Sequence, residues 1–225
     1  FASIWIFTLG LPWRLGADFF YRHLLDGDAA SNTLSWRWVA GLHTRGKPYI
    51  ARAENISMFT NGRFNPLDGE LADVCHGLEE TEPEGLPTLL SLRDVQKPKS
   101  GVPTAVLVTD EDCQIEDFDL SGFNIKGTAT LSCSHLRSSR PVSNTILSFE
   151  NGALFDAAMR LNKSSIHLKA NHPKTLANWA QEVGAKQVFT PFITCGPLWD
   201  WLKQAEPFLN DLNIKLCEQR REWDN

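Results

Sequence analysis

The sequence predicts a chain of two parts, an all-helical segment followed by a small open parallel-sheet α/β domain. Apolar residues recur at helical spacing in the first part, whereas short β-branched runs alternate with helical stretches after residue 102. A stretch rich in Glu and Pro separates the two patterns. We therefore expect a helical segment over residues 1–78, an acidic, Pro-rich linker over residues 79–102 and a Rossmann-like α/β domain over residues 103–225.

The composition is that of an ordinary globular protein. The 225 residues are 42% hydrophobic and 22% charged, which suffices for one large or two small domains. Because the net charge is -5, any contact with nucleic acid has to come from a local basic patch. The five cysteines are widely spaced and show no metal-ligand pattern. We predict no metal site, no disulfide framework and a cytoplasmic location.

The longest apolar stretch covers residues 1–13 and is interrupted by Ser3, Thr8, Gly10 and Pro12. It is too short to span a bilayer, which takes roughly 20 apolar residues, so we expect a buried helix and no membrane contact. It also lacks the basic flank and cleavage site of a secretory signal. Because the chain starts with a phenylalanine inside this run, we expect partner segments upstream of it.

Two helices are expected next. The first starts at Trp13, directly after Pro12, and carries an apolar stripe made by Ala17, Phe20, Tyr21 and Leu24. Asp28 is a natural N-cap for a second helix that runs through Trp36 and Val39. Residues 47–67 are rich in turn residues, and we expect an ordered but irregular segment there.

The spacing after the turn Asp26-Gly27-Asp28 is typical of a polar pocket. Asp28, Asn32 and Trp36 are each four apart, so they lie along one helical face. On one face, a carboxylate can accept a ring N–H, an amide can meet a ring nitrogen, and an indole can donate an electron. The same spacing also suits a turn that caps an amphipathic helix with tryptophans in its core. The residues alone leave both interpretations open.

This stretch resembles the FAD-binding motif of the cryptochrome/photolyase family, in which DGD-x-A-x-N is followed after three residues by Trp-x-Trp. Here the motif is residues 26–32 and Trp36-Arg37-Trp38. The similarity extends to flanking segments, which are Leu11-Pro12-Trp13-Arg14-x-Gly16, Pro48-Tyr49, Asn55 and Phe64-Asn65-Pro66. It covers residues 1–66 and is greatest to a bacterial subgroup that carries the run WIFTLxLPWxLGADFF. Two segments depart from the pattern, the spacer Thr33-Leu34-Ser35 and residues 52–56, which lack the family's proline.

The resemblance implies FAD as the cofactor. Asp26 and Asp28 would bond the flavin region, and Asn32 would face flavin N5. Trp36 and Trp13 would be the flavin-proximal and middle members of an electron-transfer chain. The rest of the FAD site would lie upstream of residue 1, and no antenna pigment is indicated.

The resemblance also implies damaged DNA as a partner and the activity of a deoxyribodipyrimidine photolyase. In such a lyase, reduced flavin excited by blue light donates an electron to a pyrimidine lesion. A cryptochrome-like blue-light sensor that signals through a protein partner is the alternative, and a flavin-free scaffold is a third. Phosphate contacts would come from five basic residues, whose other interpretation is solvated surface charge: Arg37, His43, Arg45, Lys47 and Arg63.

The second domain is predicted from alternating runs, and it contains neither GxGxxG nor a P-loop. Strands are expected at residues 105–109, 128–133, 166–168, 187–192 and 214–218, and helices at 153–161, 174–183 and 198–209. In the order of its elements, residues 153–224 weakly resemble the latter half of the same family's α/β antenna domain, in permuted order. An unrelated α/β domain for packing or partner binding is the other interpretation. We expect Trp199 and Trp201 in the core or at an interface, and Cys195 to be structural.

Overall fold

The structure is a computed structural model that describes residues 1–67, 69–71, 76–80, 88, 90–161 and 164–224. The chain divides into two compact units, Phe1–Leu89 and Leu90–Asn225. The division falls inside the range expected for the linker. In the described ranges, no helix is long and apolar enough to cross a lipid bilayer.

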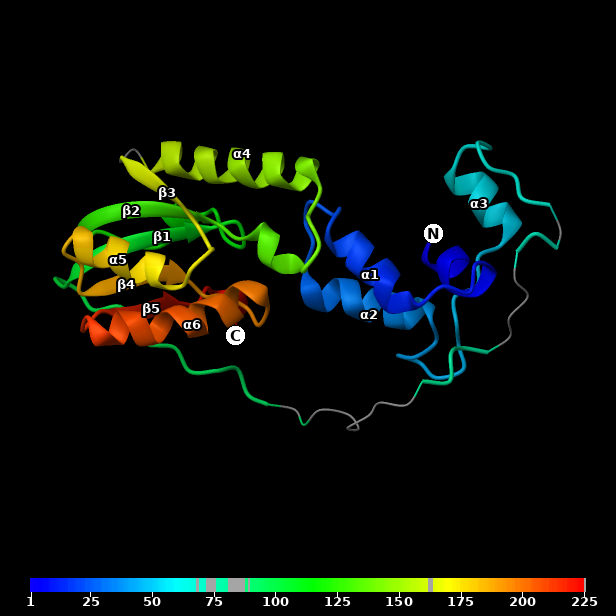
Figure 1. Cartoon of the computed structure of the whole chain (residues 1–225), viewed down its shortest axis with the longest axis horizontal. Coiled ribbons are helices and arrows are strands. Elements are labelled where there is room, and N and C mark those ends of the chain that lie inside the picture. The colour runs from blue at the N-terminus through cyan, green and yellow to red at the C-terminus, as the bar shows by residue number, and fades with distance from the viewer. Residues whose placement is uncertain (68, 72–75, 81–87, 89, 162–163, 225) are drawn as a thin grey trace. The chain divides into compact units, whose positions relative to one another are not determined.

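The first unit is helical (Figure 1). Its elements are η1 (Ile4–Thr8), a short π-helix, and the helices α1 (Trp13–Tyr21), α2 (Ala29–Val39) and α3 (Ala53–Phe59). Asp28 caps α2 as expected, because its Oδ1 accepts the backbone N–H of Ser31 at 2.6 Å. The core of this unit is formed by Ile6, Trp13, Ala17, Trp36, Ala40 and Leu42.

Three expectations for this unit need correction. Helix α1 ends at Tyr21, so Leu24, which was predicted to continue its apolar stripe, lies beyond the helix and is exposed. Of the segment expected as a buried helix, η1 buries only Ile6. Helix α3 lies inside residues 47–67, where an irregular segment was expected, because Arg52 takes an extended conformation that lets the helix start at Ala53.

The second unit is an open, fully parallel sheet of five strands, which confirms the α/β class expected for it. The strand order is β3-β2-β1-β4-β5. The strands are β1 (Pro103–Thr109), β2 (Asn124–Ser132), β3 (Ser165–Lys169), β4 (Gln187–Pro191) and β5 (Lys215–Gln219). In such a sheet the direction of winding reverses between β1 and β4, where the carboxyl ends of the strands leave a crevice.

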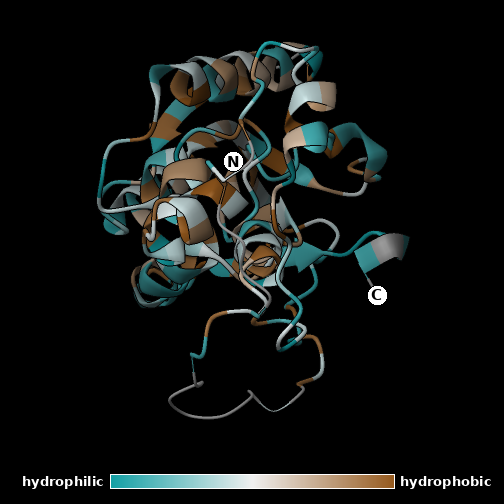
Figure 2. Cartoon of the chain, turned by 90° about the vertical axis from the view of Figure 1, so that its right-hand side faces the viewer, coloured by the Kyte–Doolittle hydropathy of each residue, from teal (hydrophilic) through white to brown (hydrophobic). Residues whose placement is uncertain are grey.

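Helices cover both faces of this sheet (Figure 1). Helix α4 (Asn144–Arg160) lies on one face, and α5 (Lys174–Glu182) and α6 (Pro197–Asp211) lie on the other. Alternate residues of β1 enter two separate cores, since Ala105 and Leu107 belong to one cluster and Val106 and Val108 to the other. Short 3-10 turns complete the unit: η2 (Ile115–Asp117), η3 (Ser134–Arg137) and η4 (Glu222–Asp224). Figure 2 shows hydrophobic (brown) and hydrophilic (teal) residues mixed along the helical ribbons of the chain.

Part of the predicted linker is bound to the sheet. Both terminal nitrogens of Arg93 donate to the Glu218 carboxylate at 2.6 Å. The Gln187 side chain bonds the backbone of Lys99 in both directions, and Ser100 donates to the carbonyl of Gly122. The second half of residues 79–102 is therefore an ordered part of the α/β unit.

Helix α4 is longer than expected. The sequence predicts its start at Ala153, whereas it begins at Asn144, where the Ser143 hydroxyl accepts the backbone N–H of Ile146 at 3.3 Å. Polar residues and Gly152 in its first half weaken the sequence signal. Trp201 lies in the core as expected, and Trp199 is partly buried against it.

Candidate functional site

A pocket of about 280 Å³ opens along the face of α2 that the sequence singled out. The three predicted cofactor-binding residues, Asp26, Asp28 and Asn32, line it together with Trp36, which was predicted to transfer electrons. Its other lining residues are Ala2, Phe20, Leu24, Ser31, Ser35 and Val39. Ser31 and Ser35 are one helical turn apart and next to Asp28 and Asn32, so helical periodicity could have identified them.

Trp36 is held rigidly at the inner wall of this pocket. It is 2% exposed, and the Phe20 ring packs against it edge to face at a centroid distance of 5.3 Å. Gly16 of α1 faces the same indole, and a Cβ atom on Gly16 would overlap the Trp36 ring. The glycine therefore allows α1 to approach α2 closely enough to enclose the indole.

Asn32 has a fixed orientation. Its amide nitrogen donates to the carbonyl of Ala17 at 2.9 Å, which ties α2 to α1. Among the described residues, its amide oxygen has no donor and is available to a ring N–H at the pocket.

The two aspartates lie at the exposed mouth of the pocket. One oxygen of Asp28 is engaged in capping α2, which leaves its second oxygen for a ligand. Asp26 precedes the cap and adds a second carboxylate near the helix start. The mouth thus offers hydrogen-bond acceptors, and the interior offers an amide and an indole.

Trp13 lies outside this pocket. It is 5% exposed and lines a second pocket of about 360 Å³, which shares Asn32 with the first. Its indole N–H donates to Oε2 of Glu80 at 3.2 Å, and Arg14 donates to the same oxygen at 2.9 Å. The sequence did not single out Glu80, because it lies 67 residues from Trp13 in the range expected for the linker.

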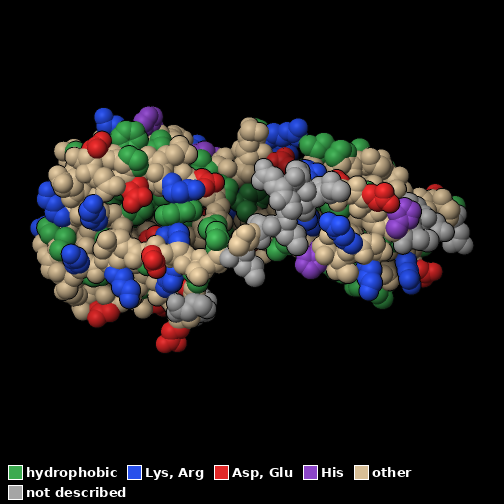
Figure 3. Space-filling model, turned by 90° about the horizontal axis from the view of Figure 1, so that it is seen from below, with side chains coloured by type: hydrophobic (Ala, Val, Ile, Leu, Met, Phe, Trp, Pro, Cys, Tyr) green, Lys and Arg blue, Asp and Glu red, His purple; other side chains and the backbone are tan. Residues whose placement is uncertain are grey.

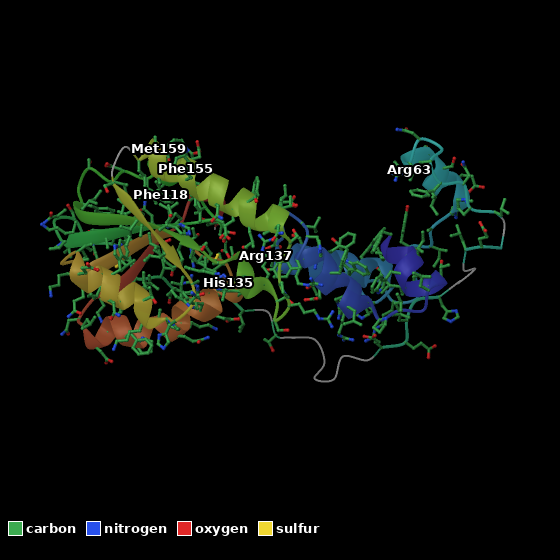
Figure 4. The ribbon with its side chains drawn as sticks, turned by 45° about the horizontal axis from the view of Figure 1, so that its top comes forward. Arg63, Phe118, His135, Arg137, Phe155 and Met159 are labelled. Atoms are coloured by element: carbon green, nitrogen blue, oxygen red, sulfur yellow. The ribbon has the colours of Figure 1, made fainter. Side chains whose placement is uncertain are left out.

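The five predicted DNA-contacting residues differ in exposure and in position. Arg37 is half-buried, with its guanidinium 6.0 Å from the centre of the Trp13 ring, whereas His43, Arg45 and Lys47 are exposed in the turn after α2. Arg63 follows α3 (Figure 4) and lines a third pocket of about 760 Å³. Its lining includes four aromatic side chains, those of Phe1, Tyr49, Phe59 and Phe64. Basic and acidic side chains are interspersed over both units on the face in Figure 3.

One buried polar cluster lies at the carboxyl end of β1 and β2, made by Asp110, Cys133 and Glu150. Glu150 accepts the backbone N–H groups of Cys133 and Ser134 at 2.6 and 2.8 Å, and the Ser134 hydroxyl at 2.6 Å. The Cys133 thiol donates to Asp110. Burial raises the pKa of both the Asp110 carboxyl and the Cys133 thiol. The cluster therefore joins α4 to the strand ends through hydrogen bonds within the protein.

Several other titratable residues have ordinary structural surroundings. His135 and Arg137 lie on η3 (Figure 4), where a ring nitrogen of His135 bonds the carbonyl oxygen of Ala170 at 3.1 Å. Cys195 is exposed. Burial raises the pKa of both Cys113 and Cys217 to about 11, which keeps those thiols protonated at neutral pH.

Comparison with known proteins bears on the first unit. Residues 1–68 match the family described as the FAD binding domain of DNA photolyase. Three proteins named deoxyribodipyrimidine photo-lyase are similar to this chain over short stretches. That of Salmonella typhimurium is 42% identical over 69 residues, which is 31% of this chain and 14% of that protein. That of Streptomyces griseus is 49% identical over 47 residues, which is 21% of this chain and 10% of that protein. That of Buchnera aphidicola is 42% identical over 49 residues, which is 22% of this chain and 10% of that protein.

Proposed function

We propose that this protein is a flavoprotein that repairs pyrimidine lesions in DNA. The repair would use blue-light-driven electron transfer from reduced FAD. The proposal starts from the match of residues 1–68 to the FAD binding domain of DNA photolyase. The chain spans about a tenth of the length of the curated relatives that it matches, so the activity is proposed for the whole protein. One observation carries the proposal. Asp26, Asp28, Asn32 and Trp36 line a single pocket.

The hydrogen-bonding groups of this pocket suit part of a flavin. Its volume of about 280 Å³ lies at the small end of ligand pockets, which suits one ring system better than a whole dinucleotide. The open oxygen of Asn32 can accept a ring N–H, and the aspartates can accept N–H or O–H groups at the mouth. When bound, FAD would supply the light absorption and the one-electron chemistry.

The protein's own residues would position the cofactor and relay electrons. Asn32, held by Ala17, would orient the ring, and Trp36 would exchange electrons at the buried wall of the pocket. Trp13 belongs to the same core cluster as Trp36 and would be the next member of the relay. The packing of Phe20 and Gly16 against Trp36 excludes water from this path.

The aromatic pocket beside Arg63 supports damaged DNA as the substrate. A base swung out of a duplex needs apolar or aromatic walls, and Tyr49, Phe59 and Phe64 supply such surfaces. Arg63 could meet a phosphate at its rim, and the exposed His43, Arg45 and Lys47 could add backbone contacts. These contacts are local, which agrees with the net charge of -5.

The absorption spectrum of the full-length protein tests this proposal, recorded in darkness and after blue light with a reductant. We expect a flavin spectrum that bleaches in light, and bleaches much more slowly in Trp36→Phe. Light-dependent repair of dimer-containing DNA is then expected, with weaker DNA binding in Arg63→Gln. Failure to bind FAD even when it is added would refute the cofactor assignment, and a photoreducible protein without repair activity would refute the lyase assignment.

A light sensor that signals through a protein partner is the second candidate, and the surface of α4 favours it. Phe149, Phe155 and Met159 are 53%, 69% and 65% exposed on this helix, and Phe155 and Met159 are labelled there in Figure 4. Phe155 and Met159 are four residues apart and share one face of the helix, and exposed apolar patches often mark protein contacts. In that case Phe155→Ser with Met159→Ser should abolish a light-dependent change in association, measured by sedimentation, while flavin photoreduction is retained. An association state that light leaves unchanged would argue against the sensor.

A further inference from the structure

The outward face of α4 lacks the charged residues that normally cover an exposed helix. Between Asn144 and Phe155 the sole charged side chain in the sequence is Glu150, which is buried. Helices at a protein surface usually carry charged and polar residues on the side away from the core. Here that side carries the exposed side chains of Phe149, Phe155 and Met159 (Figure 4). This face is therefore suited to contact with another apolar surface.

Gly152 lies in the middle of this face, and the fold of one copy does not require a glycine there. Glycine is unfavourable inside a helix relative to alanine. A Cβ atom on Gly152 would meet no atom within 4 Å, whereas one on Gly16 would overlap a neighbouring ring. The Gly152 backbone is also outside the left-handed region that favours glycine. An exposed helical position without a side chain does allow the backbone of a second helix to approach closely.

The face is complementary to itself about Gly152. Phe149 and Phe155 are three residues before and three residues after it, so they are rotated by equal angles to opposite sides of it. Thr145 and Met159 are related in the same way, at seven residues on each side. If two antiparallel copies of α4 cross at Gly152, Phe155 of one copy comes level with Phe149 of the second copy, and this contact occurs twice. A twofold interface requires such a reciprocal pairing.

The apolar area of this face indicates how strong such a contact can be. Phe149, Phe155 and Met159 are 53%, 69% and 65% exposed, which corresponds to roughly 370 Å² in one copy if each residue has about 200 Å² to bury. With the small residues between them, two copies would bury roughly 1,000 Å², the lower end for a specific interface. Interfaces of this size are weak and transient, so we expect association at micromolar protein concentration.

We propose that the outward face of α4 binds the same face of a second copy of this protein, as an antiparallel, twofold pair of helices that crosses at Gly152. This association needs neither flavin nor light, which distinguishes it from the light-dependent partner of a sensor. It uses no residue of the pocket on α2, so its test is independent of the proposed repair activity.

Sedimentation of the full-length protein in darkness, over a range of concentrations, tests the proposal. We expect a reversible dimer with a dissociation constant on the order of 10 µM. Phe149→Lys and Phe155→Glu each place a charge in the apolar contact and should weaken self-association at least about tenfold. An equal mixture of these two variants should associate again, because the new lysine and the new glutamate come level across the pair while the other two phenylalanines still meet. This recovery would also show that both variants are folded.

Ile166→Lys is the matched control. Ile166 is an exposed apolar residue on β3, and β3 is an edge strand of the sheet, which is another surface through which two copies could pair. This variant should associate as wild type does. Dissociation by Ile166→Lys alone would overturn the proposal in favour of the sheet edge. A wild-type protein that is monomeric at every concentration, or that dimerises only after illumination, would also overturn it. Two α4 variants that dissociate but fail to associate when mixed would overturn the antiparallel crossing at Gly152.

Discussion

The candidate site depends on Gly16 having no Cβ atom. The pocket wall is a tryptophan from α2, and it fits because the facing position on α1 has no side chain. Gly16 is buried within a helix, where glycine is normally unfavourable relative to alanine. Its cost to the helix is offset by the close contact between α1 and α2.

Gly16→Ala should therefore destabilise the first unit, although alanine is the better helix former. The added methyl group overlaps the Trp36 ring, and overpacking of this kind costs about 1–3 kcal/mol. We expect a lower unfolding midpoint and an altered near-ultraviolet circular dichroism signal from displaced tryptophan. Gly152→Ala is the control, since nothing lies within 4 Å of that position in α4, and it should leave stability unchanged or raise it. Equal behaviour of the two variants would contradict the role of Gly16.

Asp110 makes a pH-dependent contribution that has the opposite sign to that of most carboxylates. Burial is the main reason that its pKa is raised from 3.8, and the charge of Glu150 adds to it. The folded protein therefore holds this proton to a higher pH than the unfolded chain does. The stabilisation that Asp110 contributes is fully present below the pKa that it has in the unfolded chain. It is lost as the pH rises through the higher pKa that it has in the folded protein.

Asp110→Asn should remove that loss. The stability of the variant relative to wild type, measured by urea unfolding, should become more favourable as the pH rises from about 4 to 7. Asp119→Asn is an opposite control, because hydrogen bonds from Ser121 lower the pKa of that exposed carboxyl. The stabilisation from Asp119 is lost only as the pH falls below about 4, so the Asp119→Asn variant should show no gain relative to wild type between pH 4 and 7. Parallel trends in the two variants would show that burial of Asp110 does not control its ionisation.

The residues of the pocket could be predicted from the sequence because they share one helix. Asp28, Asn32 and Trp36 are related by the period of α2, which any regular helix imposes. Gly16 and Glu80 contact the same tryptophans from distant positions, and no local period relates them. The roles of these residues remain predictions.

At the scale of elements, α4 and the end of β2 are fastened together by one carboxylate. Glu150 is 3% exposed and receives the backbone N–H groups of Cys133 and Ser134, which would otherwise be unpaired at the start of η3. The α4 helix therefore serves as more than a cover for the sheet, because it completes the turn that follows β2. The sequence predicted the strand and the second half of the helix, but their connection depends on side-chain packing across the face.

Glu150→Ala should cost about 2–3 kcal/mol of unfolding free energy, because it leaves two buried N–H groups without acceptors. Chemical denaturation followed by tryptophan fluorescence measures this change. Asp156→Ala on the same helix is the matched control. Asp156 pairs with Arg160 at 68% exposure, and loss of such a surface pair is expected to cost less than about 1 kcal/mol. A Glu150 variant that is as stable as the Asp156 variant would refute the anchoring role.

At the scale of the whole chain, the strand and helix order of the α/β unit follows from local patterns, whereas the limits of the unit do not. Alternating β-branched and helical stretches predicted all five strands, because each strand carries its own apolar run. Residues 93–101 read as a linker because they are polar and contain Pro98. These residues have a defined structure because they bond to distant residues in β4 and β5, such as Gln187 and Glu218. A local pattern cannot predict such contacts.

The segment before β1 should therefore decide whether the α/β unit is stable alone. Arg93 donates to both oxygens of the buried Glu218 carboxylate and to the carbonyl of Ile193, and its guanidinium stacks 3.6 Å from the centre of the Trp199 ring. Removal of one partner of a buried ion pair leaves the other charge uncompensated and costs about 3–5 kcal/mol. A fragment of residues 90–225 should unfold cooperatively, and one of residues 103–225 should unfold at a clearly lower urea concentration.

Arg93→Met in the longer fragment separates this ion pair from the other contacts of the segment. It should reproduce most of the loss, about 3 kcal/mol, because methionine keeps much of the apolar packing against Trp199 but leaves Glu218 unpaired. Arg140→Met is the control at an exposed arginine and should change stability by less than about 0.5 kcal/mol. If the two fragments unfold at the same urea concentration, residues 90–102 act as a linker after all. If the two fragments differ in stability but Arg93→Met leaves stability unchanged, the contacts of Lys99 and Ser100 hold the segment. These contacts do not depend on the charge of Glu218.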